Sequence, residues 1–288
     1  MLRGSSFDAF LTPGVQTYGV AEEWYHSEAY PDWWGNTVML EAFIDSPMQH
    51  RDLTVFPVLS PHGPVLPYLL STDIQDSGAL TVREKGDEVI PMLLARNNSL
   101  HPILILAGEP LPGGDPGRLV ERSVLLGGKS VTQIPASGRE SGGWANPEQE
   151  AEITDWLQHF PLIERQVGLL AFFGDRLLGL EALGAANLYG PLHRRLLIRF
   201  IKETFNQPSP SIQDLSGLEE EARKVVDALG DADRVATKRV GAGDYWSLSG
   251  PIFGGDLIYQ GHLVHLSVHP APVGMAERRQ SEGAGQCY

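Results

Sequence analysis

Short apolar runs, each closed by proline or glycine, fill the sequence from about residue 53 to residue 135 and constrain the fold more than any other feature. Runs of this length fit β-strands and are too short for core helices. Several are apolar on both faces, which predicts burial in the middle of a sheet. The links between them are too short for crossover helices, so antiparallel pairing is expected. The predicted strands are Leu53–Leu59, Leu80–Glu84, Val89–Ala95, Ile103–Ala107 and Ser123–Leu126.

The second half of the chain adds helix signals. One helix is predicted to begin at Asn146-Pro147, a second near Pro191 and a third at Ser216, where a serine and a glutamate three residues later form a capping-box pattern. Apolar runs at 167–173 and 177–183 predict a hairpin, and closing strands are expected at 256–259 and 262–268. The predicted fold class is α+β, with a largely antiparallel β-sheet core in the N-terminal half and about three helices packed from the C-terminal half.

The chain divides into three expected regions. Residues 1–52 form an acidic, aromatic N-terminal extension, residues 53–270 a single α+β domain, and residues 271–288 a flexible tail. The extension contains an aromatic cluster, Trp24, Tyr25, Tyr30, Trp33 and Trp34. Such a cluster usually anchors a terminal segment to a core, and a carbohydrate-binding platform is the alternative.

Charge and composition exclude several classes of protein. A formal charge of −14 repels phosphate backbones at long range, so general nucleic-acid binding is not expected. No apolar run reaches the roughly 18–20 residues that cross a bilayer, and the N-terminus lacks a signal-peptide core. Cys287 is the only cysteine, so we expect no internal disulfide and a cytoplasmic protein.

The histidines near the C-terminus do not predict a metal site. His265 and His269 would share one side of the last strand and His262 the other, which is poor geometry for three ligands from one strand. Half-buried or surface imidazoles are therefore favoured, and we assign no metal ligands and no cofactor from the sequence.

The stretch from Ala107 to Arg118 is the first candidate site. A buried strand runs directly into Gly108-Glu109, and strand ends often carry functional residues. The stretch contains four glycines, which can hold backbone amides around an anion, while Arg118 offers a planar fork for a carboxylate or phosphate. The alternative is a surface loop with a solvated salt bridge.

The stretch from Pro135 to Trp144 is the second candidate site. It follows the strand-like run Val131–Ile134 and supplies Arg139, Glu140 and Trp144 on a glycine-rich backbone. Trp144 could stack on a base or sugar, and Glu140 could accept a ribose hydroxyl or a proton. The alternative is a loop entering a helix, with Trp144 packed on the core. If the two stretches meet, Glu109 and Glu140 form the pair of carboxylates that glycoside hydrolysis requires.

These residues together resemble a known family, the ADP-ribosylglycohydrolase and rhodanese-phosphatase-superfamily-associated protein domain family. The resemblance spans roughly residues 53–270 and rests on many short signals in the same order. They are Val55-Phe56-Pro57, Arg96-Asn97-Asn98-Ser99, Gly108-Glu109, Arg118, the run from Pro135 to Trp144, Gln166-Val167-Gly168 and His262-Leu263-Val264-His265-Leu266.

The resemblance implies, by association, a role in binding or processing NAD-derived nucleotides. Glu109, Arg118, Glu140 and Trp144 match the family's residues at those positions. The chain departs from the family at Gly113–Arg118, where members carry Gly-Ala-Lys-Gln-Asn-Arg, and at Gly138, where members tend to carry cysteine.

Our leading hypothesis is a site for a nucleotide or sugar phosphate such as ADP-ribose. We assign catalytic roles to Glu109 and Glu140, and ligand-binding roles to Arg118, Trp144, Asn97 and Arg139. Binding alone and turnover at a ribosyl or phosphoryl centre are both compatible with these residues. The rival hypotheses are a non-catalytic interaction protein, including a homo-oligomer, and a carbohydrate-active protein.

Overall fold

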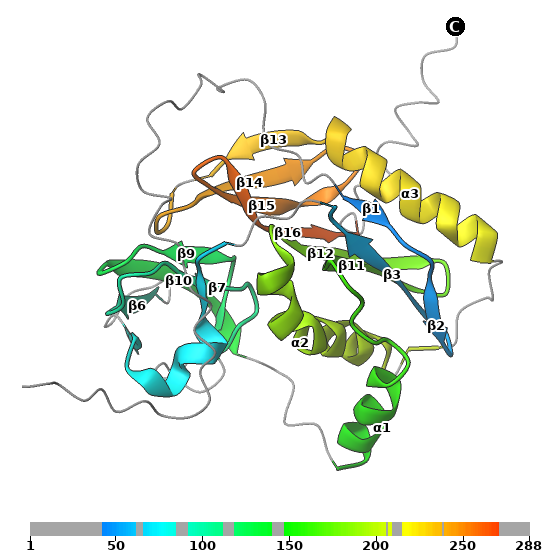
Figure 1. Cartoon of the computed structure of the whole chain (residues 1–288), viewed down its shortest axis with the longest axis horizontal. Coiled ribbons are helices and arrows are strands. Elements are labelled where there is room, and N and C mark those ends of the chain that lie inside the picture. The colour runs from blue at the N-terminus through cyan, green and yellow to red at the C-terminus, as the bar shows by residue number, and fades with distance from the viewer. Residues whose placement is uncertain are drawn as a thin grey trace, which may run out of the picture. The chain divides into compact units, whose positions relative to one another are not determined.

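The computed structural model describes residues 42–61, 66–84, 92–111, 118–139, 147–205, 207–208, 215–237 and 239–270. Within these ranges the chain forms a mixed α+β domain rich in antiparallel strands (Figure 1). None of the helices in these ranges is long and apolar enough to span a membrane.

The largest sheet has nine strands and draws on both halves of the chain. Its order is β1-β3-β11-β12-β16-β15-β14-β13, and β2 also pairs with β3. All of these neighbouring strands pair antiparallel, as the short connections predict. The strands are β1 Phe43–Ile44, β2 Met48–His50, β3 Leu53–Leu59, β11 Gln166–Phe173, β12 Arg176–Leu183, β13 Asp233–Ala236, β14 Asp244–Ser249, β15 Phe253–Tyr259 and β16 His262–His269.

Two smaller sheets come from the segment between β3 and α1. One has the order β5-β6-β10-β8, and the other the order β4-β7-β9, in which β4 and β7 run parallel. Their strands are β4 Leu69–Leu70, β5 Leu80–Glu84, β6 Met92–Asn97, β7 Ile103–Ile105, β8 Arg118–Val120, β9 Val124–Leu126 and β10 Val131–Arg139. A 3-10 helix, η2 Ser71–Ser77, follows β4. A separate apolar cluster fills these sheets, with Ile103, Leu126 and Ile134 fully buried.

Three helices cover the two faces of the large sheet. α1 Pro147–Leu157 packs on α2 Ala186–Thr204, and α2 packs on β11 and β12. These elements share one apolar cluster, in which Tyr189 and Phe200 of α2 are buried. α3 Leu215–Asp231 belongs to a second cluster with the opposite face of the sheet, through Leu218 and Ala222 (Figure 1). The polar residues of the candidate site lie where the α2 face of the large sheet meets the smaller sheets.

Several predicted elements agree with the structure. β3 and β5 have the predicted bounds, and β11 and β12 form the predicted hairpin around Gly174, whose φ is 58°. β15 and β16 pair through Gln260 and Gly261, both with positive φ, as a two-residue turn requires.

Other elements differ from the prediction. α2 begins at Ala186 rather than near Pro191, so Pro191 lies inside the helix, where it cannot donate a backbone hydrogen bond to the carbonyl of Asn187. Residues 135–139, expected in a loop, continue strand β10, where Pro135 pairs with Met92 and a register shift follows Ser137. Strands β1, β2, β4, β8, β13 and β14 were not predicted, because they are short or only partly buried.

Gly184 joins β12 to α2 and provides a test of this connection. A Cβ at this position would lie 1.7 Å from the carbonyl oxygen of Leu263, whereas a Cβ at Gly217, within α3, would meet no atom within 4 Å. We expect Gly184→Ala to destabilise the protein by about 2 kcal/mol or more, because backbone must move. Gly217→Ala should be neutral or stabilising by up to about 1 kcal/mol, because alanine favours helix. Urea unfolding measures both, and equal effects would contradict the tight β12–α2 join.

Candidate functional site

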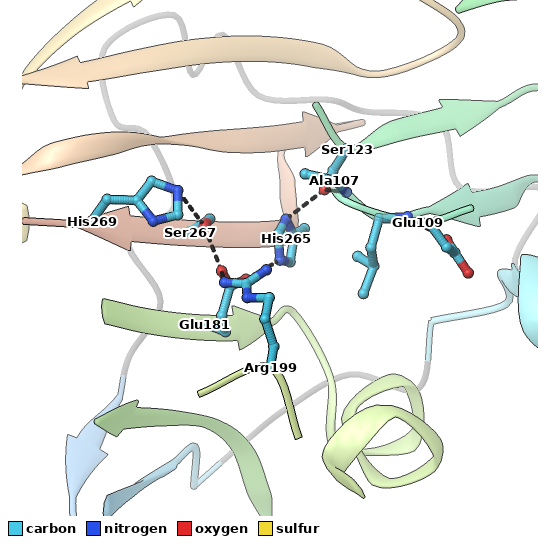
Figure 2. A network of polar contacts seen from close by, with 9 residues as sticks. Ala107, Glu109, Ser123, Glu181, Arg199, His265, Ser267 and His269 are labelled. Carbon is cyan, nitrogen blue, oxygen red and sulfur yellow. Dashed lines mark hydrogen bonds and ion pairs between the residues drawn. The ribbon is translucent and has the colours of Figure 1, made fainter. Parts of the chain in front are cut away.

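Glu181 lies at the centre of a buried network on the α2 face of the large sheet (Figure 2). It sits on β12, with its side chain fully buried. His265 Nε2 lies 2.7 Å from its Oε2, and Ser267 Oγ donates to its Oε1 at 2.6 Å. Arg199 of α2 also donates to Oε1. Strand pairing explains the convergence, because Glu181 lies opposite Ser267 and Leu183 opposite His265.

The surroundings of Glu181 keep it ionised. Burial acts to raise the pKa of this carboxyl, but the charge of Arg199 and the hydrogen bonds from His265 and Ser267 outweigh burial and lower the pKa to about 2. An ionised carboxylate only accepts hydrogen bonds, so His265 must carry a proton on Nε2. Glu181 is therefore a fixed buried anion that orients its donors and is unsuited to proton transfer near neutral pH.

His269 forms the exposed end of this network. Its Nε2 lies 3.1 Å from Ser267 Oγ, whose own hydrogen goes to Glu181, so His269 is the donor in this contact. The side chain lies at the end of β16 and is exposed. Desolvation lowers the pKa of His269, Glu181 acts to raise it, and Arg199 and His265 act to lower it. The imidazole is therefore mostly neutral at pH 7 and can accept a proton.

Ser123 links the network to the smaller sheets. It precedes β9, and its Oγ lies 2.9 Å from His265 Nδ1 and accepts a hydrogen bond from the backbone N–H of Ala107. A serine, a histidine and a carboxylate in line are the arrangement of nucleophilic hydrolases. Here, however, Ser123 is only 2% exposed, so a substrate cannot reach its hydroxyl in this conformation. The contact between Ser123 and His265 connects the sheet that contains β9 to the large sheet, which contains β16.

Glu109 anchors a second buried network beside the first. It follows β7, is 1% exposed and accepts hydrogen bonds from Ser71 Oγ at 2.6 Å and from the backbone N–H of Leu106 at 2.7 Å. Arg195 of α2 donates to its Oε1 at 2.6 Å. The two networks meet along the chain, because Leu106 bonds to Glu109 and the next residue, Ala107, bonds to Ser123.

Two arginines of α2 are therefore each hydrogen-bonded to a buried carboxylate. Arg195 and Arg199 are four residues apart, which places them on one side of the helix. Their side chains are 36% and 34% exposed, whereas Glu109 and Glu181 are 1% and 0% exposed. Each guanidinium is bonded to a buried carboxylate, while about a third of the arginine side chain is exposed. A fixed pair of this kind suits an oxyanion ligand.

Tyr245 and Arg122 border the same polar face. The guanidinium of Arg122 lies 5.6 Å from the centre of the Tyr245 ring and donates to Thr237 Oγ1. The Tyr245 hydroxyl lies over Gly255, where a Cβ would be 2.1 Å from it, so glycine provides the room that the tyrosine occupies. Desolvation raises the pKa of Tyr245, Arg122 acts to lower it, and Glu181 and Asp256 act to raise it. The hydroxyl thus stays protonated and can donate a hydrogen bond.

The side chains of the first pair of predicted site residues have different partners, although their backbones run side by side. Glu109 bonds to Arg195, whereas the side chain of Arg118 lies beside Glu84, with Nε 3.6 Å from Oε1. Asn97 is 1% exposed, and its amide bonds to the carbonyls of His101, Leu126 and Gly127 while its oxygen accepts from Ser99. Those contacts connect the turn that contains Asn97 to the end of β9.

The second predicted stretch is only partly covered. Arg139 lies on β10 by its backbone. Glu140 and Trp144 fall outside the described residues, as do the aromatic residues of the N-terminal extension, so the meeting of Glu109 with Glu140 stays a prediction.

The sequence did not single out Glu181, Arg195 and Arg199. Glu181 was predicted only as part of an apolar strand, and no role was predicted for the two arginines. One signal could have found them: a lone carboxylate inside an apolar run needs a buried partner.

Comparison with known proteins identifies a family for this chain. A family model described as "ARG and Rhodanese-Phosphatase-superfamily-associated Protein domain" matches residues 41–151 and 145–269. The match begins before residue 53, where the resemblance was expected to begin, and so takes in β1 and β2. No curated protein and no solved structure matches.

Replacing Glu181 should change the response of the protein to acid. Because the folded pKa of about 2 lies below the ordinary 4.5, the ionised carboxylate stabilises the fold above pH 4.5, and this stabilisation is lost as the pH falls toward 2. We expect Glu181→Gln to destabilise the protein by roughly 3 kcal/mol at pH 7, with the difference narrowing below pH 4.5. Urea unfolding at a series of pH values measures this difference, and a constant difference would show that Glu181 is not the buried anion.

Proposed function

Because the chain belongs to the ARG and Rhodanese-Phosphatase-superfamily-associated Protein domain family, we propose that it binds a phosphate-bearing small molecule beside α2. The class we favour is an NAD-derived nucleotide or a sugar phosphate such as ADP-ribose. This ligand class follows if "ARG" stands for ADP-ribosylglycohydrolase, and that interpretation is part of the proposal. The single observation that carries it is the pair Arg195 and Arg199, each held on a buried carboxylate.

The carboxylates explain why the arginines suit a ligand. A long cation at a surface loses side-chain entropy when it binds, and a guanidinium already fixed by Glu109 or Glu181 loses less. Each arginine retains N–H groups for phosphate oxygens after its bond to the carboxylate. Two such groups on adjacent turns of one helix match a diphosphate or two neighbouring oxygens of one phosphate.

The net negative charge of the protein favours a small, local anion-binding site over an extended one. The chain carries a formal charge of −14, so an anion is not attracted from a distance. Glu109 and Glu181 offset the charges of their arginines, and Arg122 adds a further guanidinium beside Tyr245. Affinity would therefore come from short, directed hydrogen bonds at the α2 face.

The remaining groups fit the rest of a nucleotide. The ring of Tyr245 is partly exposed and could stack on a base or sugar, and its protonated hydroxyl could donate to an oxygen. The neutral imidazole of His269 could accept a proton from a ribose hydroxyl. If the protein turns its ligand over, His269 is the proton acceptor that we propose, and the reaction lies at a ribosyl or phosphoryl centre.

The residues named from the sequence take different places in this proposal. Glu109 acts by positioning Arg195 rather than by touching the ligand. Arg118, Arg139, Glu140 and Trp144 keep the ligand-binding or catalytic roles proposed from the sequence. Asn97 is left out, because its amide is already bonded to backbone carbonyls.

Calorimetry with ADP-ribose, NAD, ADP and ribose 5-phosphate tests the proposal. We expect the wild-type protein to bind at least one of them, and Arg195→Ala or Arg199→Ala to weaken binding by about 10- to 100-fold, the range for a lost charge-assisted hydrogen bond. Arg194→Ala is the matched control, since it removes the same side chain from an exposed position next to Arg195.

Two outcomes would overturn the proposal. One is no heat and no thermal shift with any of the four compounds. The other is equal weakening by Arg194→Ala and Arg199→Ala, which would mean that the anion is held by general surface charge.

A further inference from the structure

Two histidines and an aspartate from separate segments meet on the side of the domain where β2 faces α1. The ligand atoms of His50, Asp155 and His159 all lie within 4.8 Å of one another. His50 ends β2, Asp155 belongs to the last turn of α1, and His159 follows in the turn after that helix. His50 Nε2 lies 3.7 Å from Asp155 Oδ2, and the rings of His50 and His159 stack with centroids 3.8 Å apart.

One ring nitrogen of His50 lacks a hydrogen-bond partner among the described residues. Its Nε2 is shielded from solvent and has no hydrogen-bond partner in the described residues, although Asp155 lies just beyond bonding distance. The edge of Trp156 packs against the His50 ring, with centroids 5.3 Å apart, and limits its rotation. A buried ring nitrogen without a partner is costly, and ligand atoms of Asp155 and His159 lie close to this ring.

The donor set fits a divalent transition ion. Two imidazole nitrogens and one carboxylate oxygen are ligands of Zn²⁺ at roughly 2.0–2.2 Å, and this places ligand atoms about 3.3 Å apart in a tetrahedral site. The widest separation of 4.8 Å would have to close by about 1.5 Å, which rotations of the exposed Asp155 and His159 side chains can supply. His50, the least exposed of the three, would stay in place.

Arg51, the cation next to His50 in the sequence, should repel a bound metal ion only weakly. Arg51 is bonded to Glu152 at 2.7 Å, and its guanidinium lies over the Trp156 ring at 5.3 Å from the centroid. Its charge is thus paired and its side chain directed onto the indole. Asp155 is 55% exposed, so incoming water could complete the coordination.

We propose that His50, Asp155 and His159 form a binding site for one divalent transition-metal ion, with Zn²⁺ the best fit. Three protein ligands leave at least one position for water or another small ligand, as in open zinc sites. The ion would tie the end of α1 to β2, two elements otherwise joined through side-chain packing. The site shares no residue with the arginine pair of α2.

Titration with Co²⁺ and Zn²⁺ tests this site in the full-length chain. A Cys287→Ser background removes the one thiolate that could bind either ion. We expect one equivalent of Co²⁺ to give visible ligand-field bands that Zn²⁺ abolishes, and Zn²⁺ to raise Tm. His159→Ala and Asp155→Asn should each weaken binding by at least about tenfold. Both side chains are exposed, so both variants should fold, as circular dichroism will show.

His101→Ala is the matched control, because it removes an exposed histidine far along the chain from the cluster. It should bind like the parent protein. Unchanged affinity in His159→Ala would place the ion elsewhere and overturn the proposal, and so would the absence of stoichiometric binding at micromolar metal. Nucleotide binding tested on the same variants should be unaffected, so failure of the metal site and failure of the arginine site are distinguishable.

Discussion

A carboxylate removed from water must be matched by donors, and Glu181 imposes this requirement in the middle of the large sheet. The fully buried group is satisfied by His265, Ser267 and Arg199, which come from β16 and α2. Breaking such a set leaves an uncompensated buried charge, which costs several kcal/mol. The register between β12 and β16 and the position of α2 on the sheet are therefore fixed by one charge as well as by apolar packing.

The same requirement gives the α2 face its candidate function. Glu109 repeats the arrangement with Arg195, so both exposed guanidiniums are held by groups that are themselves held by the core. A scaffold alone would be served as well by apolar residues, because buried ion pairs add little net stability. The protein has two such ion pairs, each with a partly exposed arginine of α2. They are better explained as a means of positioning those arginines for an anion.

Sequence patterns predicted the parts of the fold that depend on local chemistry. β3 and β5 were located because apolar runs end at turn residues, and the β15–β16 hairpin because only Gln260 and Gly261 separate two apolar runs. The site was found only in part, because its contacts are long-range. Glu109 was named for its place at a strand end, but its ion-pair partner Arg195, which lies 86 residues away, was not identified. No local pattern reports that distance, and Glu181 lies 84 residues from His265.

A double-mutant cycle between Glu181 and Arg199 measures the central interaction most directly. Glu181→Gln, Arg199→Met and the double variant would be compared with the wild type by the free energy of unfolding at neutral pH. The account predicts a coupling free energy of at least about 1 kcal/mol, because each single change leaves the other group unpaired. Additive effects would contradict it, since they would mean that the buried carboxylate does not hold the helix arginine in place.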